Sequence, residues 1–249
     1  MEFAREVIQW FSDPANWTGD GGIPIRVSEH LLLSAVPLLV ALAIGLPVAA
    51  WVGHTGRFGG LAINVSNIGR AIPSLAIMAI AAMLLNRWLV DIGLRREAGE
   101  ITTMVAMAAL AVPPIVTNTY VGISEVERDL VEAARGMGMT ATQVLRRVEI
   151  PLAMPVILAG VRTAAVQVVA TATLGAVFGT GGLGRYIIDG IAQRNNQEVF
   201  AGALIVAAMS IGTELAFGLV ERRAVSPGVR EGPIVPTLGP GGTGRPLGL

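Results

Sequence analysis

Three ionisable side chains lie in stretches that are otherwise apolar, and they are the first candidates for chemistry. They are Arg70 in residues 61–85, Arg162 in residues 152–178 and Glu214 in residues 199–220. A charge at the middle of a bilayer costs about 2.5 to 3.5 kcal/mol on insertion scales, so each group should face protein or water and find a partner. Two interpretations follow. Glu214 could form a structural ion pair with Arg162 or Arg70 that holds two helices together, or these groups could take a direct part in the passage of a solute or in its gating.

The types of residue that are absent exclude several other chemistries. All 18 basic residues are arginine, and there is no cysteine. Without lysine the chain cannot form the phosphate cradle of a P-loop ATPase or a Schiff base. Without cysteine it has no disulfides, thiolate zinc sites or iron–sulfur ligands. The two histidines, His30 and His54, stand at opposite ends of one apolar stretch, so we expect no metal site. Because the chain has no nucleotide site of its own, we also expect no cofactor and no catalytic activity.

A glycine motif in residues 179–184 has the form of a nucleotide-binding loop. Gly179, Gly181 and Gly184 match G-x-G-x-x-G. A dinucleotide site requires this run between a strand and a helix, whereas here it follows an apolar stretch. We expect these glycines to let the chain turn and pack closely.

Membrane helices are the elements that must position these groups. Only 14% of the residues are charged and 53% are hydrophobic, whereas a soluble domain has roughly 25% charged residues. A transmembrane helix needs about 20 mostly apolar residues, and five stretches qualify: 31–52, 61–85, 101–123, 152–178 and 199–220. We therefore expect an all-α membrane protein with about five transmembrane helices. Prolines should interrupt two of them, at Pro73 and at Pro113 with Pro114.

The apolar stretches divide the chain into three regions, and the distribution of arginine predicts their orientation. We expect an extracytoplasmic segment at residues 1–28, a transmembrane domain at 29–223 and a cytoplasmic tail at 224–249, disordered because it is rich in proline and glycine. Nine arginines fall on the side that holds the loop 124–151 and the C-terminus, and seven on the other. Because arginine accumulates in cytoplasmic loops, this places the N-terminus outside and the C-terminus inside. The balanced net charge gives no nucleic-acid footprint.

The loop at 124–151 is long and patterned. Val126, Leu130 and Ala134 recur at helical spacing among charged residues, which predicts a short amphipathic helix ended by Gly136 or Gly138. Thr140 is a suitable N-cap for a second short helix that reaches Pro151. On amphipathicity alone the loop could be a solvated connector, but two helices at the membrane surface would form a protruding knob.

The residues of this loop resemble the E-A-A-x3-G-x9-I-x-L-P motif of binding-protein-dependent ABC import permeases. The matching positions are Glu132, Ala133, Ala134, Gly138, Val148, Ile150 and Pro151. In that family the motif forms coupling helices that sit in a groove of the cytoplasmic ATPase. The resemblance implies a type I ABC importer permease fold with cytoplasmic coupling helices. It assigns the ATPase coupling to Glu132, Ala133, Ala134, Arg135 and Gly138.

Further stretches are similar to permeases for quaternary-ammonium osmoprotectants, namely residues 70–76, 118–122, 132–139, 160–164 and 179–184. This resemblance implies a permease subunit of the bacterial inner membrane that imports glycine betaine, carnitine or choline. It also implies three kinds of partner besides the lipid bilayer: ABC ATPase subunits, a second permease subunit that is identical or homologous, and an extracytoplasmic solute-binding protein.

The translocation path is expected near Arg70, Pro73, Ser74 and Asn118, with Glu214. Arg70 departs from the glutamine or valine that the family often has there. Two alternatives remain open at this point. One is a permease of the same superfamily for methionine or phosphonate. The other is an ion-coupled secondary carrier that uses Glu214 as its proton site, although the absence of inverted repeats weighs against it.

Overall fold

The computed structural model describes residues 2–225, and every regular element in them is helical. Four long helices form the bundle: α2 (Ile23–Thr55), α5 (Ala98–Ser124), α8 (Ile150–Thr171) and α10 (Asn196–Ala224). Shorter elements are α1 (Glu2–Ser12), η1 (Pro14–Trp17), α3 (Gly59–Ala71), α4 (Ser74–Asp91), α6 (Arg128–Gly136), α7 (Ala141–Val144), η2 (Leu145–Glu149), η3 (Ala172–Phe178) and α9 (Gly184–Gln193). The tail expected over 224–249 lies almost wholly outside the described residues.

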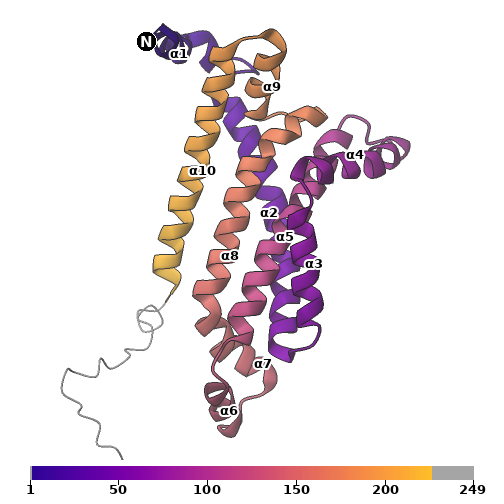
Figure 1. Ribbon diagram of the computed structural model, residues 1–249, viewed down its shortest axis with the longest axis vertical. Helices are drawn as coiled ribbons and strands as arrows, with labels where there is room; N and C mark the ends of the chain where they lie inside the picture. Colours follow the sequence, from indigo (N-terminus) through magenta and orange to yellow (C-terminus); the bar gives the residue numbers. More distant parts are fainter. Residues whose placement is uncertain (1, 226–249) are drawn as a thin grey trace, which may run out of the picture.

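The short helices gather at the two ends of the bundle. Figure 1 shows α1 and α9 at one end, here called the α9 end, and α6 and α7 at the other, the α6 end. Helices α2, α5 and α10 run from the α9 end towards the α6 end, and α8 runs in the opposite direction (Figure 1). By length and composition five helical segments could cross a membrane: Ile23–Thr55, Ser74–Asp91, Ala98–Ser124, Ala141–Phe178 and Asn196–Ala224. The expected all-α architecture with five candidate spans is confirmed.

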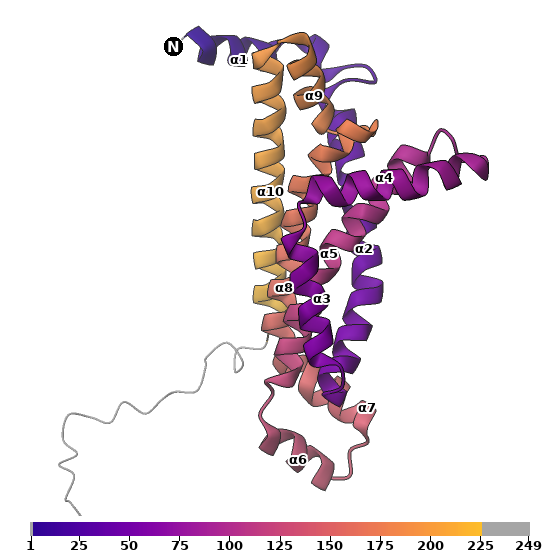
Figure 2. The same cartoon turned by 45° about the vertical axis from the view of Figure 1, so that its right-hand side comes forward.

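The second expected span, residues 61–85, is two helices rather than one. Helix α3 ends at Ala71, Ile72 is extended with φ −80° and ψ 128°, and α4 begins after Pro73. The residue before a proline is pushed out of the α region by the proline ring, which stops α3 at this point. Figure 2 shows α4 leaving the bundle at a steep angle to α3. The interruption at Pro73 is confirmed, but the single span is not.

The break expected at Pro113 and Pro114 is absent, because α5 continues through both. A proline inside a helix removes a backbone hydrogen bond and usually bends or ends the helix. Here α5 packs against α2, α3, α4 and α8, and its side chains Met107 and Ile115 are fully buried. These contacts hold α5 in one piece.

Close packing of small residues joins α5 to its neighbours. A Cβ placed on Gly122 would lie 3.0 Å from Cβ of Val156, and one on Gly53 would lie 2.9 Å from Cβ of Ile123. Membrane helices associate mainly through such close backbone approach, since lipid is as apolar as the side chains. The main core lies where α2, α4, α5 and α8 meet, around Met78, Met107 and Val168.

Candidate functional site

The segment between α5 and α8 forms a separate projection at the α6 end (Figure 1). It consists of α6, a turn at Met137–Met139, the single turn α7 and the π-helical turn η2. We call residues 125–149 the coupling segment. The two short helices expected here are present, and η2 continues directly into α8 instead of ending before it.

The spacing of alanine and glycine in this segment has a structural cause. Gly138 has φ +86°, its N–H donates to the carbonyl of Arg135 at 2.9 Å, and the N–H of Met139 donates to the carbonyl of Ala134 at 3.2 Å. This pair of bonds is a Schellman motif, which ends a helix with a left-handed residue that is usually glycine. An A-x3-G spacing therefore stops α6 and turns the chain back at a fixed point.

The proposed coupling residues do not all face outward. Glu132, Ala133, Arg135 and Gly138 are exposed, whereas Ala134 is 2% exposed and packs inward. Ala134 therefore holds α6 in place, and the other four present a surface on the tip of the projection.

The second half of the segment begins at a complete capping box. Thr140 and Gln143 exchange hydrogen bonds: the Thr140 N–H donates to Gln143 Oε1 at 2.8 Å, and the Gln143 N–H donates to Thr140 Oγ1 at 3.4 Å. This arrangement satisfies backbone donors at the start of α7. The N-cap expected at Thr140 is confirmed.

The expected path residues lie in three separate places. Arg70, Pro73 and Ser74 surround the break between α3 and α4, where Arg70 is exposed. The other two, Asn118 in α5 and Glu214 in α10, lie elsewhere in the bundle. Among the described residues, no side-chain hydrogen bond or ion pair joins these three places.

Asn118 faces α8. Its Nδ2 donates to the carbonyl of Pro114 in its own helix at 2.8 Å, and a Cβ added to Gly160 would lie 2.5 Å from its Cβ. The Asn118 side chain therefore gives the Pro114 carbonyl a hydrogen-bond donor, and it lies within the contact between α5 and α8.

Glu214 forms the ion pair that its place in an apolar segment requires. Arg162 of α8 lies 3.5 Å from Glu214 and 3.2 Å from Glu221, both in α10. Seven residues along a helix is about two turns, so both carboxylates lie on the face of α10 that meets α8. Arg70 is not part of this cluster. Of the two partners considered for Glu214, the structure thus pairs it with Arg162.

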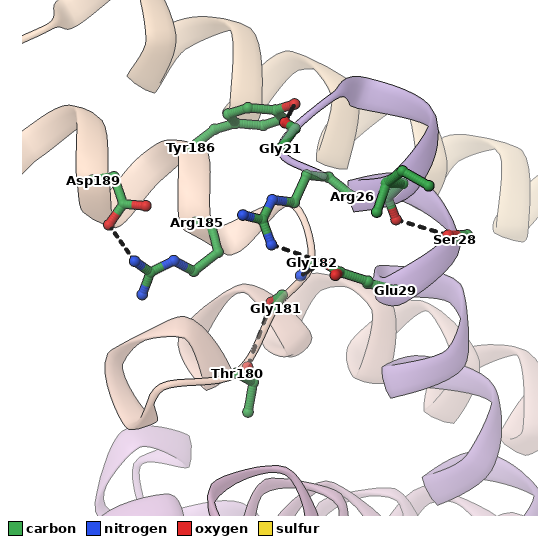
Figure 3. Close-up of polar contacts among 11 residues, drawn as sticks. Gly21, Arg26, Ser28, Glu29, Thr180, Gly181, Gly182, Arg185, Tyr186 and Asp189 are labelled. Atoms are coloured by element: carbon green, nitrogen blue, oxygen red, sulfur yellow. Dashed lines mark hydrogen bonds and ion pairs between the residues drawn. The ribbon is translucent and has the colours of Figure 1, made fainter. Parts of the chain in front are cut away.

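Glycines 179–184 form the turn between η3 and α9, with no strand in residues 2–225. Figure 3 shows Arg26 and Glu29 of α2 reaching this turn. The carboxylate of Glu29 lies 2.9 Å from Nη1 of Arg26 and accepts the N–H of Gly182 at 2.7 Å. Gly182 has φ +83°, and a Cβ on Gly181 would lie 2.5 Å from Oε2 of Glu29. The close packing expected of these glycines is confirmed.

Tyr186 closes the same network above the turn. Its hydroxyl donates to the carbonyl of Gly21 at 2.6 Å (Figure 3). Burial raises the pKa of Tyr186, and the carboxylates of Glu198 and Glu29 act in the same direction, while Arg26 opposes them. The phenol is therefore a donor at neutral pH and ties the start of α2 to α9.

Sequence reasoning missed two long-range contacts that involve histidine. His30, fully buried, donates from Nε2 to the carbonyl of Val169 at 2.9 Å. His54 lies with Nδ1 2.6 Å from Oε2 of Glu149. The only signal in the sequence was that each is a polar residue in or beside an apolar stretch, and such a signal does not name a partner. Within residues 2–225 no group of three or more metal-ligating side chains is present.

Comparison with known proteins agrees with this architecture. The family model described as "binding-protein-dependent transport system inner membrane component" matches residues 41–226. The chain is 32% identical to the glycine betaine/carnitine/choline transport system permease protein OpuCB of Bacillus subtilis, covering 86% of this chain and 93% of that protein. It is 36% identical to the choline transport system permease protein OpuBD of the same organism, covering 91% of this chain and 93% of that protein. The osmoprotectant import permease protein OsmW of Salmonella typhimurium is 33% identical, covering 74% and 82%.

Solved structures share the fold. The inward-facing MetNI methionine ABC transporter matches with a TM-score of 0.70 at 22% identity, covering 86% of this chain and 99% of that chain. An amino acid ABC transporter solved with histidines matches with a TM-score of 0.56 at 23% identity, covering 80% of this chain and 92% of that chain.

The fold is that of type I ABC importer permeases. The chain is an inner-membrane, multi-pass permease subunit. It is not itself an enzyme, because ATP hydrolysis in this family belongs to a separate ATPase subunit. Membership in the family also implies a binding protein as a partner. The alternative of an ion-coupled carrier is not favoured. The chain belongs to the family of binding-protein-dependent transport system inner membrane components.

Proposed function

We propose that this chain forms the membrane path of an ATP-driven importer for quaternary-ammonium osmoprotectants such as glycine betaine, carnitine or choline. The relatives at 32% to 36% identity are named for these solutes. The methionine transporter, at 22% identity, supports the shared fold alone. The observation that carries the proposal is the exposed tip of the coupling segment, a surface that an ATPase subunit can hold.

The coupling segment is suited to this task because local hydrogen bonds close its turns and because it projects from the bundle (Figure 1). The Schellman motif at Gly138 and the capping box at Thr140 order its two turns. Glu132 and Arg135 then present opposite charges on one exposed surface, and charged groups at such a surface favour one partner and one orientation. We assign the docking of the ATPase to Glu132, Ala133, Arg135 and Gly138, with Ala134 as their support.

The α6 end is the cytoplasmic end in this proposal, with the N-terminus outside and the C-terminus inside. The excess of arginine on the α6 side supports this orientation. The natural chain has no cysteine, so single cysteines report sidedness cleanly. Met137→Cys, at a position that is 75% exposed, should react with an impermeant maleimide only in inside-out vesicles, and Ala4→Cys only in right-side-out ones. The reverse pattern would contradict the orientation.

A second permease subunit, identical or homologous, should complete the path. One subunit contributes few helices, and α4 extends from the bundle with Met83 and Leu84 at 81% and 71% exposed. The expected path residues Arg70, Pro73 and Ser74 lie where α4 leaves α3, so a facing subunit would enclose them. Their part in passage, and that of Asn118 and Glu214, is an assignment within this proposal.

The test is uptake by the complete transporter in proteoliposomes, with the ATPase, the binding protein and internal ATP. We expect labelled glycine betaine, carnitine or choline to accumulate, and excess methionine not to compete. Uptake should stop with vanadate and persist with a protonophore. Accumulation of methionine or a phosphonate instead would overturn the solute assignment, and uptake that needs a proton gradient but no ATPase would overturn the mechanism.

A further inference from the structure

A buried hydrogen bond joins the coupling segment to the end of α2. Nδ1 of His54, in the last turn of α2, donates to Oε2 of Glu149 at 2.6 Å. The side chains are 12% and 6% exposed, and the residues are 95 positions apart. A carboxylate that is removed from water requires hydrogen-bond donors, and His54 supplies one.

Glu149 is the last residue of the π-helical turn Leu145–Glu149. A π turn holds one residue more per hydrogen-bonded ring than an α-helix, is rare, and frequently lies at a functional site. This one lies where the coupling segment becomes the membrane helix α8. A change between π and α pairing here would rotate the coupling segment relative to α8.

His54 lies in a part of α2 that cannot move alone. The adjacent Gly53 packs on Ile123 at the end of α5, where an added Cβ would lie 2.9 Å away. The ends of α2, α5 and α8 therefore converge beside the coupling segment. Among the side-chain hydrogen bonds and ion pairs of residues 2–225, the His54–Glu149 contact is the one that joins this segment to another span.

We propose that His54 and Glu149 are a positioning pair that holds the π turn against α2, so that displacement of the coupling segment moves α2 together with α8. The inference rests on the proposed function. Without the pair, the π turn can rearrange while α2 stays behind, and ATP hydrolysis then proceeds with less solute moved. The pair sets the ratio of solute imported to ATP hydrolysed.

The experiment measures this ratio in proteoliposomes that contain the complete transporter. His54→Leu and Glu149→Met remove the two hydrogen-bonding groups and approximately keep the side-chain volumes. Each should lower the ratio about ten-fold, as expected for the loss of a charge-assisted hydrogen bond. The reciprocal double variant His54→Glu with Glu149→His rebuilds the pair and should restore most of the ratio, which a role in folding alone would not predict.

Thr55→Ala is the matched control. Its hydroxyl bonds only to the carbonyl of Trp51 and the N–H of Arg57 within the described residues, away from the coupling segment, so the ratio should not change. If the apolar variants fail to assemble with the ATPase, His54→Asn and Glu149→Gln test the positioning role in their place. His54→Asn keeps a neutral donor and Glu149→Gln a neutral acceptor, so each keeps a weakened hydrogen bond and should lower the ratio about three-fold.

An unchanged ratio in the assembled variants, or a double variant as poor as the single ones, overturns the positioning role. Failure of the proposed function has a different signature: the wild-type transporter itself would then import no osmoprotectant in the presence of ATP. The two failures are therefore told apart within one set of measurements.

Discussion

Glu29 of α2 accepts a hydrogen bond from the backbone N–H of Gly182 at 2.7 Å, across 153 positions of the chain. The same carboxylate pairs with Arg26 at 2.9 Å. A carboxylate that accepts a backbone N–H and a guanidinium together forms two charge-assisted bonds, which are stronger than neutral ones. The turn between η3 and α9 is therefore tied to the start of the first long helix.

Replacing Gly181 by alanine should loosen this tie. The new Cβ would lie 2.5 Å from Oε2 of Glu29, so the carboxylate must move away from Gly182. Overpacking of this kind costs about 1 to 3 kcal/mol, and we expect a lower melting temperature for the purified permease in detergent. Gly212→Ala in α10, where an added Cβ meets nothing within 4 Å, is the control and should not lower it. Equal melting temperatures for the two variants would contradict the close contact.

The two glycines of the coupling segment should respond in opposite ways to alanine. Gly138 is left-handed at φ +86°, and forcing a side chain into that region costs about 1 to 2 kcal/mol. Gly138→Ala should therefore disturb the end of α6, reduce co-purification of the ATPase and reduce solute uptake. Gly136→Ala lies inside α6 with open space around its Cβ, so it should keep or improve assembly. Normal assembly and uptake in Gly138→Ala would argue against the coupling assignment.

Arg162→Gln should destabilise the α8–α10 contact more than Glu221→Gln, because it leaves two carboxylates without their partner. The expected loss is about 1 kcal/mol, the upper end for ion pairs whose side chains are 31% to 51% exposed. Thermal unfolding in detergent measures the order of the two variants. The exchange Arg162→Glu with Glu221→Arg should restore both assembly and uptake. Restored assembly without uptake would instead give these groups a direct part in passage.

Stability should fall at alkaline pH through Tyr186, whose pKa burial raises above its usual value of about 10. The unfolded chain loses the phenolic proton first, so the tyrosine's contribution is complete below pH 10 and declines as the pH rises towards the folded-state pKa. Tyr186→Phe should flatten this decline and cost about 1 kcal/mol at neutral pH, since it leaves the carbonyl of Gly21 unpaired. Melting temperatures between pH 8 and pH 11 provide the check.

The sequence located the helices well because lipid imposes a simple requirement. A segment that crosses a bilayer must be long, apolar and internally hydrogen-bonded, so charge-poor runs mark it without knowledge of its neighbours. The break at Pro73 was equally local, since the proline ring restricts the residue before it. The tip of the coupling segment was also readable, because the Ala134 and Gly138 spacing is itself the rule that ends α6.

The effects of neighbouring helices on a segment could not be predicted from the sequence. Pro113 and Pro114 looked like a break, but contacts with four other helices keep α5 whole. The segment 61–85 looked like one span, but the direction that α4 takes after Pro73 depends on the packing of Met78 and Ala81 in the core.

By itself the sequence determined which segments are helical, where one of them breaks and where the coupling segment turns, because these follow from bonds between residues a few positions apart. Only the tertiary structure decided which polar groups meet, as in Glu29 with Gly182 and His54 with Glu149. The reason is that partners 95 to 153 positions apart are chosen by how the helices pack. A buried charge in a sequence shows that a partner must exist, but only the packed chain shows which one.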